Sequence, residues 1–378
     1  MNTKFDLAIV GAGIAGLAHA YHAARRGLKV AVFDRSVRAQ GASIRNFGMV
    51  WPVGQVRGAK YERATRALGH WQTLAKGAGF DLTQTGSLHL AYRSDEWAVL
   101  QEFVAEHHDP AQVVSLLSPT ETLTRSQWVN PDGLVGSMWS ESEHVTTSPV
   151  AIRAIPAYLE REYGVQFFWQ HAVTRVGTGF VVARDQDFDA DRVIVCSGVD
   201  FETLLPQAIA QSPMVKCKLQ MFSGRMPDPA FALGPCLCAG LTLLHYDAFS
   251  ACATLPALKA RVERELPDTR EHGIHILVSQ HATGELILGD SHHYGPDPQP
   301  FDLELVQQIM ERELATFTCF TGMQITRRWH GLYAKTPGET EWMSEPAKRV
   351  HLVNGLGGTG MSLTLGLAEE NIDRLYAA

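Results

Sequence analysis

A glycine-rich hexapeptide near the N-terminus is the strongest chemical signal in the sequence. Residues 11–16 read Gly-Ala-Gly-Ile-Ala-Gly and stand between an apolar run and a segment with helical periodicity. In such a turn Gly11 permits a sharp bend, Gly13 lets the backbone approach a pyrophosphate, and Gly16 lets the helix pack closely on the strand. The first helical turn, with Ile14 and Ala15, then presents its N–H groups to the phosphates. The pattern predicts dinucleotide binding.

An acidic residue follows where the ribose of such a ligand would lie. Asp34 closes the second apolar run, residues 29–33, and Arg35 comes directly after it. A carboxylate at this point accepts hydrogen bonds from the adenosine ribose and disfavours a 2′-phosphate. We therefore expect Asp34 and Arg35 to lie beside the adenosine half of the ligand.

Two further glycine signals bear on the identity of the dinucleotide. Residues 354–360 form a second glycine-rich turn before a helical segment, and the strand-like residues 192–196 end in Ser197-Gly198. In a flavoenzyme a second helix N-terminus can face the pyrimidine edge of the isoalloxazine, where negative charge collects on reduction. A plain glycine loop is the alternative. The combination favours FAD over NAD, with these flavin-facing candidates: Gly357, Gly358, Thr359 and Gly360.

The pattern of elements indicates an α/β protein in which two domains are interleaved. Residues 5–10, 12–26 and 29–33 predict one strand–helix–strand unit, and residues 349–353 and 361–375 return to that pattern near the C-terminus. The middle third predicts antiparallel strands instead. We expect a Rossmann-type FAD-binding domain made of residues 1–80, 146–212 and 320–378, and an antiparallel-sheet substrate domain made of residues 81–145 and 213–319.

Composition narrows the class of partner. The 378 residues carry a net charge of −7 without a basic stripe, which argues against nucleic acid and anionic membranes. Apolar runs are too short for a membrane span. The six cysteines lack zinc-ligand spacing, so we expect no metal and reduced thiols in a cytoplasmic enzyme. The apolar segment 7–18 imitates a secretory signal, but the glycines within it and Asp6 directly before it do not fit one.

A fourth motif, Ser-Ile-Arg-Asn-Phe-Gly-Met-Val at residues 43–50, completes a resemblance. In this order the four motifs resemble the superfamily of glycine oxidase, D-amino acid oxidase and sarcosine oxidase, over nearly the whole chain. The resemblance implies a glutathione reductase/D-amino acid oxidase-like fold, with the substrate above the flavin and beneath an antiparallel sheet. It also implies that Ser43, Arg45 and Asn46 lie along the flavin. Val173 would contact adenine, and Ser197 and Gly198 would pass near the phosphates.

Departures from the family pattern concern the substrate. Gly331 stands where sarcosine oxidases attach FAD to a cysteine, so the resemblance implies non-covalent FAD beside Gly331. Tyr333 stands where D-amino acid oxidases carry a carboxylate-binding arginine, which disfavours an ordinary α-amino acid. Ile287 stands where sarcosine oxidases carry the lysine that activates oxygen. The electron acceptor is therefore O2 or another molecule.

Two stretches, residues 43–52 and 288–295, look like one branch of the superfamily that is associated with bacterial phosphonate breakdown. This resemblance implies oxidative deamination or N-dealkylation of 2-aminoethylphosphonate, or of its N-methyl or hydroxy derivative. The candidate catalytic residues are His293, Tyr333 and Arg45, because the amine must lose a proton and a reduced flavin carries negative charge. The candidate substrate-binding residues are Arg45, His292, His293, Tyr294, Arg328, Trp329 and Tyr333.

Each of these candidates also has an interpretation that involves no substrate. Arg45 can serve only the flavin, Arg328 can be a solvated strand residue, and the His292-His293 pair can be a surface feature. For the whole chain, alternatives are a glycine, D-amino acid or sarcosine-type oxidoreductase, an NAD-dependent dehydrogenase, and an FAD-bound electron-transfer or assembly subunit.

Overall fold

The N-terminal unit forms as the sequence predicts. In the computed structural model, which describes residues 4–377, β1 (Phe5–Val10) and β2 (Val30–Asp34) are parallel neighbours joined by α1 (Ile14–Arg25). Both strands are almost entirely buried, because parallel strands covered on both faces are apolar throughout. Gly27 ends the helix with a φ of 79° that glycine adopts without strain.

These strands lie in the centre of an eight-stranded sheet whose parallel part has the order β9-β2-β1-β12-β20. The long strand β12 extends beyond this part and pairs with an antiparallel hairpin, and β19 pairs antiparallel with β20. This sheet is the predicted Rossmann-type sheet. Its remaining strands are β9 (Gln166–Trp169), β10 (Val173–Gly177), β11 (Phe180–Ala183), β12 (Gln186–Val195), β19 (Trp342–Ala347) and β20 (Val350–Asn354).

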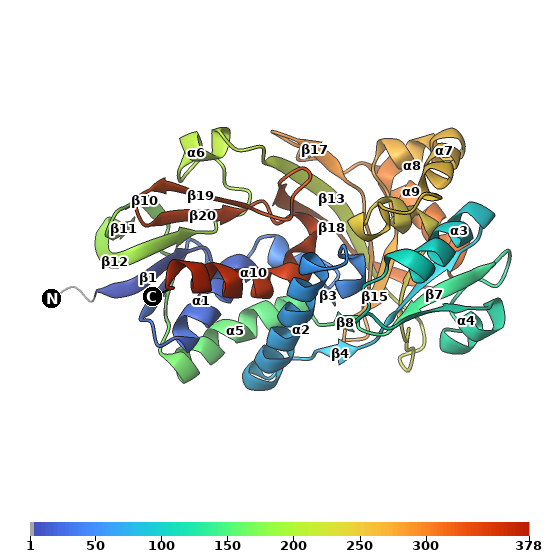
Figure 1. Cartoon of the computed structure of the whole chain (residues 1–378), viewed down its shortest axis with the longest axis horizontal. Helices are drawn as coiled ribbons and strands as arrows, with labels where there is room; N and C mark the ends of the chain where they lie inside the picture. The colour runs from blue at the N-terminus through green and yellow to red at the C-terminus, as the bar shows by residue number, and fades with distance from the viewer. Residues whose placement is uncertain (1–3, 378) are drawn as a thin grey trace.

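Helices from both ends of the chain cover one face of this sheet (Figure 1). The helix α10 (Gly360–Leu375) packs against both α1 and α2 (Ala59–Ala78). The helix α5 (Ser148–Tyr163) also packs against α1 and α2. His19 on α1 is buried and its Nε2 lies 2.9 Å from the side-chain amide of Asn371 on α10. The opposite face packs against the β10–β11 hairpin and the short helix α6 (Pro206–Ala210).

The second lobe is built on a nine-stranded sheet with the order β17-β13-β16-β15-β14-β5-β7-β6, and β18 pairs with β13. In Figure 1 the long strands β13 and β18 reach from this lobe toward the first. Its strands are β5 (Ser87–Ala91), β6 (Val114–Leu117), β7 (Gly136–Ser140), β13 (Val215–Arg225), β14 (Cys236–Cys238), β15 (Leu277–Gln280), β16 (Leu286–Gly289), β17 (His293–Gly295) and β18 (Gln324–Lys335).

Apolar residues on both faces of this sheet form two further cores. A small sheet, β3-β8-β4, connects the lobes. The surrounding helices are α3 (Ser94–Glu102), α4 (Pro119–Arg125), α7 (Leu255–Glu265), α8 (Pro267–Glu271) and α9 (Glu304–Phe317), and the small-sheet strands are β3 (Met49–Val50), β4 (Thr83–Gln84) and β8 (His144–Val145).

One part of the expected domain division needs correction. The sequence assigned residues 320–378 to the cofactor domain, but β18 pairs with β13 along its full length and belongs to the substrate sheet. The pairing is between strands far apart in the chain, so no local pattern reveals it. The fold class itself, a Rossmann-type domain interleaved with an antiparallel sheet, is confirmed.

Candidate functional site

The first glycine turn has the geometry that its sequence predicts. Gly11 adopts a φ of 101°, and a Cβ atom there would lie 2.4 Å from the carbonyl oxygen of Cys196. A Cβ on Gly16 would lie 1.8 Å from the carbonyl oxygen of Gly11. In the described residues no side chain caps α1 and no acidic residue lies in its first turn, so its positive end is open to an anion.

Two side chains hold this turn in place. The Asp34 carboxylate accepts a 2.9 Å hydrogen bond from the N–H of Ala12, and the Ser43 hydroxyl accepts one of 2.9 Å from the N–H of Ile14. Asp34 keeps further lone pairs for a ribose. Arg35 instead points to Asp200, at 2.7 Å and largely exposed, so the structure shows it in an ion pair and not in the turn. Val173 begins β10 and is buried.

The three glycine signals meet in space although they are far apart in the sequence. A Cβ on Gly360, at the start of α10, would lie 4.0 Å from the side chain of Ile14. Asn354 donates a 2.7 Å hydrogen bond to the carbonyl oxygen of Gly198, which ties the second turn to the third signal. The Ser197 hydroxyl oxygen is buried without a hydrogen-bond partner among residues 4–377. An unpaired buried hydroxyl beside an open helix end suits a phosphate-bearing ligand.

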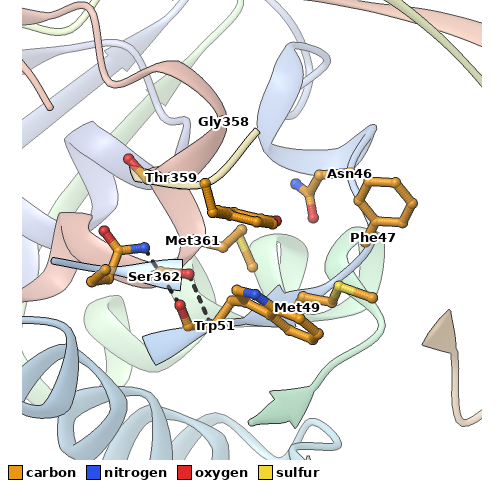
Figure 2. Close-up of a pocket in the computed structure, with 10 residues that line it drawn as sticks. Asn46, Phe47, Met49, Trp51, Gly358, Thr359, Met361 and Ser362 are labelled. Atoms are coloured by element: carbon orange, nitrogen blue, oxygen red, sulfur yellow. Dashed lines mark hydrogen bonds between the residues drawn. The ribbon is translucent and has the colours of Figure 1, made fainter. Parts of the chain in front are cut away.

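A small pocket of about 50 Å³ opens next to the second turn. Figure 2 shows Asn46 and Phe47 on one side, Trp51 and Met49 below, and Gly358 and Thr359 on the other side. The backbone N–H of Trp51 donates to the Ser362 hydroxyl at 2.8 Å, which fixes this loop to α10. The pocket therefore lies where three separate segments of the chain meet.

Asn46 serves the loop itself. Its amide nitrogen donates to the carbonyl oxygens of Ala42 and Ser43, and its Oδ1 accepts from the N–H of Gly48 and from the Ser148 hydroxyl. Three of these contacts lie within residues 42–48, and the fourth ties the loop to Ser148 at the start of α5. Asn46 therefore holds the loop rigid at the edge of the pocket.

Arg45 brings the same loop against β18. Its guanidinium donates to the carbonyl oxygen of His330 at 3.3 Å, and the Trp329 indole N–H donates to the carbonyl oxygen of Arg45 at 3.4 Å. A Cβ on Gly331 would lie 3.7 Å from that same Arg45 oxygen. The loop and β18 thus form adjoining walls.

Alternation along the strands gives β18 and β13 an inner face and an outer face. The inner face, which turns toward the loop of Arg45, carries a buried apolar cluster that includes Ile287 and Trp329. On this face Tyr294, Cys217 and Tyr333 lie in one row across β17, β13 and β18. Burial raises the pKa of the Tyr333 hydroxyl well above its usual value, so Tyr333 remains a hydrogen-bond donor.

Lys335, which the sequence analysis did not select, ends this inner face. Its ammonium lies 3.4 Å from the Tyr294 hydroxyl, and its stem lies against Gly357 of the second glycine turn. Tyr294 is about half exposed, at 49%, so the row opens to solvent at this edge. The signal that could have found Lys335 is its period-two spacing from Gly331 and Tyr333.

The outer face holds two residues that were expected at the substrate. Arg328 is half exposed and lies 3.2 Å from Glu311 on α9. His293 pairs in register with Lys218 and its Nε2 lies 3.1 Å from the Nδ1 of His272. Because a strand turns successive side chains to opposite faces, neither is on the face of Tyr333. The side chain of His292 points away from that of His293. It is buried beside His275 and His245.

Comparison with known proteins gives the family. The pattern of the DAO family, described as FAD dependent oxidoreductase, matches residues 6–374. The chain belongs to this family. An opine oxidase subunit from Agrobacterium tumefaciens (strain Ach5) is 22% identical to this DAO-family chain over 349 residues, which are 88% of this chain and 83% of that protein.

Solved structures show the same fold. Glycine oxidase from Geobacillus kaustophilus superposes with a TM-score of 0.77 at 16% identity, over 99% of this chain and 95% of that chain. L-Proline dehydrogenase from P. horikoshii superposes with a TM-score of 0.79 at 16% identity, over 100% of this chain and 94% of that chain. The DAO-family chain is an FAD-dependent oxidoreductase, and the open helix end, Asp34 and Ser197 fit that cofactor. Within residues 4–377 no helix has the length and apolarity to cross a membrane.

Proposed function

We propose that this chain oxidises a small amine that carries an anionic group. The leading substrate is 2-aminoethylphosphonate or its N-methyl or hydroxy derivative, and the reaction is oxidative deamination or N-dealkylation that yields an aldehyde and an amine. The observation that carries the proposal is the position of Lys335. On the inner face of β18 its ammonium lies 3.4 Å from the Tyr294 hydroxyl, and its stem lies against Gly357 of the second glycine turn.

Lys335 and its neighbours suit an anion. An ammonium beside hydroxyl donors forms charge-assisted hydrogen bonds with phosphonate oxygens. Tyr333, on the same face, keeps its proton and can donate a further hydrogen bond. Arg328 does not take part in binding this anion, because its side chain lies on the outer face of β18, next to Glu311. Besides Arg328, the sequence offered Arg45, His292 and His293 as candidates for the anion, and we propose Lys335 in addition to these three.

When bound, FAD accepts a hydride equivalent from the carbon next to the amine nitrogen. The residues of the chain orient the substrate and shield it from water. Arg45 stabilises the loop against β18 and supplies positive charge near the cofactor. Gly331 offers no side chain for attachment, which supports a non-covalent cofactor. Water hydrolyses the imine product after it leaves the cofactor.

The choice of a phosphonate rests on the resemblance of two sequence stretches. One of the two stretches that resemble the phosphonate branch, residues 288–295, contains His292 and Tyr294, which lie at the inner-face edge of the sheet. A second candidate is oxidation of an opine, because the relative in Agrobacterium tumefaciens is named as a subunit of opine oxidase. Because that relative is named as a subunit, a role of this chain as one subunit of a larger enzyme is a further candidate.

We propose O2 as the electron acceptor and the cytoplasm as the compartment. Ile287 is buried on the inner face where the resemblance places an oxygen-activating lysine, so another acceptor is the alternative. The six cysteines are free thiols, and five of them are buried or partly buried, which suits a reducing compartment.

The test is flavin bleaching in the absence of air. The holoprotein is mixed with 2-aminoethylphosphonate, its N-methyl and 1-hydroxy forms, glycine, sarcosine, D-alanine and the opine octopine. We expect one of the phosphonates to reduce the flavin fastest, because the others replace the phosphonate with a carboxylate.

Faster bleaching by glycine, D-alanine or octopine would contradict the phosphonate assignment, and bleaching by none would contradict the amine oxidation. Repeating the reaction in air with detection of peroxide distinguishes O2 from another acceptor. If the flavin is reduced quickly but reoxidised slowly in air, O2 is not the electron acceptor.

A further inference from the structure

Three histidines and one carboxylate from separate segments meet beneath the inner-face edge. His245 follows a short helical turn at residues 240–244, His275 precedes β15, and Asp290 and His292 lie between β16 and β17. Each histidine offers a ring nitrogen within 4.8 Å of a nitrogen of the other two. The His275 Nε2 lies 3.3 Å from the Asp290 Oδ1.

The cluster is largely buried, and several of its ligand atoms make no hydrogen bond. Among the described residues neither ring nitrogen of His275 nor the Asp290 Oδ1 has a hydrogen-bond partner, although the His275 Nε2 and the Asp290 Oδ1 lie 3.3 Å apart. The side chains of His275, His292 and Asp290 are all less than a tenth exposed. Burial lowers the pKa of all three imidazoles, to about 4 for His292, so each ring is neutral with one lone pair to give. Buried polar atoms without partners indicate a missing ligand.

The Asp290 carboxylate indicates that the missing ligand is a cation and not an anion. An anion would meet Asp290 at close range, whereas a cation would be attracted to it and would let it ionise. Lys335 lies close enough to act on the three imidazoles and opposes a cation, and ionised Asp290 balances that charge.

We propose that His245, His275, His292 and Asp290 bind one divalent transition-metal ion. The three histidines supply nitrogens that all lie within 4.8 Å of one another, and imidazole is a common ligand for zinc and its neighbours. Asp290 lies 3.3 Å from His275 and 3.8 Å from His292, so its carboxylate is the candidate for a fourth ligand. His292 shows the usual supporting contact, because its Nδ1 lies 2.9 Å from the carbonyl oxygen of Gly273 and leaves Nε2 for the metal.

Metal binding requires the imidazole rings to rotate. Nitrogens bound to one tetrahedral zinc ion lie about 3.3 Å apart, given bonds of about 2.0–2.1 Å. The rings of His275 and His292 have centroids 5.2 Å apart and are nearly parallel, at 13°, and those of His245 and His275 are closer, at 3.8 Å and 30°. Because each lone pair lies in the plane of its ring, these rings must turn about their side-chain bonds to point at one ion. The inference does not depend on the identity of the amine substrate.

The test is metal binding by the FAD-loaded protein. The protein is stripped with a chelator, and its uptake of Zn²⁺ is measured by equilibrium dialysis and elemental analysis. Co²⁺ then reports the ligand geometry through its ligand-field bands. We expect about one ion per chain, and at least about a tenfold weaker affinity for His275→Gln and for Asp290→Asn.

A matched control uses a second histidine group of the chain. His22, His70 and Glu369 also lie within 4.8 Å of one another, but near α1, so His70→Gln should leave Zn²⁺ affinity unchanged. Flavin content and melting temperature measured in chelator confirm that each variant is folded. If His275→Gln does not fold, Asp290→Asn and His292→Gln give the same comparison.

Three results would overturn the inference. The wild-type protein could take up no Zn²⁺, uptake could persist equally in His275→Gln and Asp290→Asn, or uptake could be lost in His70→Gln. Absence of uptake together with weaker binding of 2-aminoethylphosphonate by His275→Gln would assign the cluster to the substrate. Failure of the amine oxidation leaves the Zn²⁺ result readable, since dialysis requires no turnover.

Discussion

The carboxylate of Asp34 accepts a 2.9 Å hydrogen bond from the backbone N–H of Ala12, and so the end of β2 is fixed to the first glycine turn. This places the carboxylate beside the open end of α1. Asp34→Ala should lower the affinity for FAD by about ten- to a hundredfold, because a hydrogen bond to a charged group contributes about 1.5–3 kcal/mol. Titration of the apoprotein with FAD, followed by fluorescence quenching, measures the loss.

The control for Asp34 is Asp6→Ala. Asp6 accepts a 2.7 Å hydrogen bond from the N–H of Lys29, in the same strand–helix–strand unit but at the far end of the strands. Its replacement removes a comparable bond without touching the turn. If both variants lose FAD equally, Asp34 acts through stability of the unit and not through the ribose.

Gly13 tests the approach of the pyrophosphate. A Cβ on Gly13 would meet only the Ser43 hydroxyl, at 3.1 Å, so the fold tolerates a side chain there better than at Gly16. Gly13→Val should still fold, but its side chain would fill the phosphate position and reduce FAD content on the order of tenfold. The ratio of flavin to protein after purification measures this. Gly41→Ala, where an added Cβ meets nothing within 4 Å, should keep normal content.

Lys335 and Arg328 form a matched pair for the substrate anion, since both are cations of β18 on opposite faces. Lys335→Met should raise the dissociation constant for the phosphonate, measured by anaerobic flavin titration, by about tenfold or more. Arg328→Met should change it by less than about twofold, as expected for an exposed ion pair. Equal effects of the two substitutions would remove Lys335 as the anion ligand.

His19 makes the stability of the cofactor domain depend on pH. Burial lowers its pKa from 6.5 to about 4, so the unfolded chain binds the proton more tightly than the folded chain. Its contribution is present above pH 6.5 and is lost as the pH falls toward 4, on the order of 3 kcal/mol at most. Denaturant unfolding at several pH values should show a smaller loss in His19→Gln. A constant difference between the two proteins across that window would contradict this.

The sequence predicts the cofactor half of the site better than the substrate half, for a physical reason. Gly11, Gly16 and Asp34 act within one strand–helix–strand unit, so their spacing alone fixes their relative positions. The faces of β18 depend on its register with β13, which is a long-range pairing. In the sequence Arg328 and Lys335 are simply two cationic residues. Only the register of β18 with β13 shows that their side chains lie on opposite faces.

The histidine cluster illustrates the same limit more strongly. His245, His275 and His292 come from three segments with no ligand-like spacing, and the sequence analysis expected no metal site. His292 and His293 looked like one functional pair, yet the strand separates them to opposite sides. Tyr333 was expected as a candidate proton acceptor, and burial raises the pKa of its hydroxyl well above the usual value, so the hydroxyl keeps its proton.

The contact between Ile14 and Gly360 has a consequence for biosynthesis. The first glycine turn leaves the ribosome long before the turn that faces it, because more than three hundred residues separate Ile14 from Gly360. A nascent chain therefore exposes half of a nucleotide-binding surface until Gly360 has also emerged. Flavin capture should then wait for the synthesis of both turns and of the residues between them.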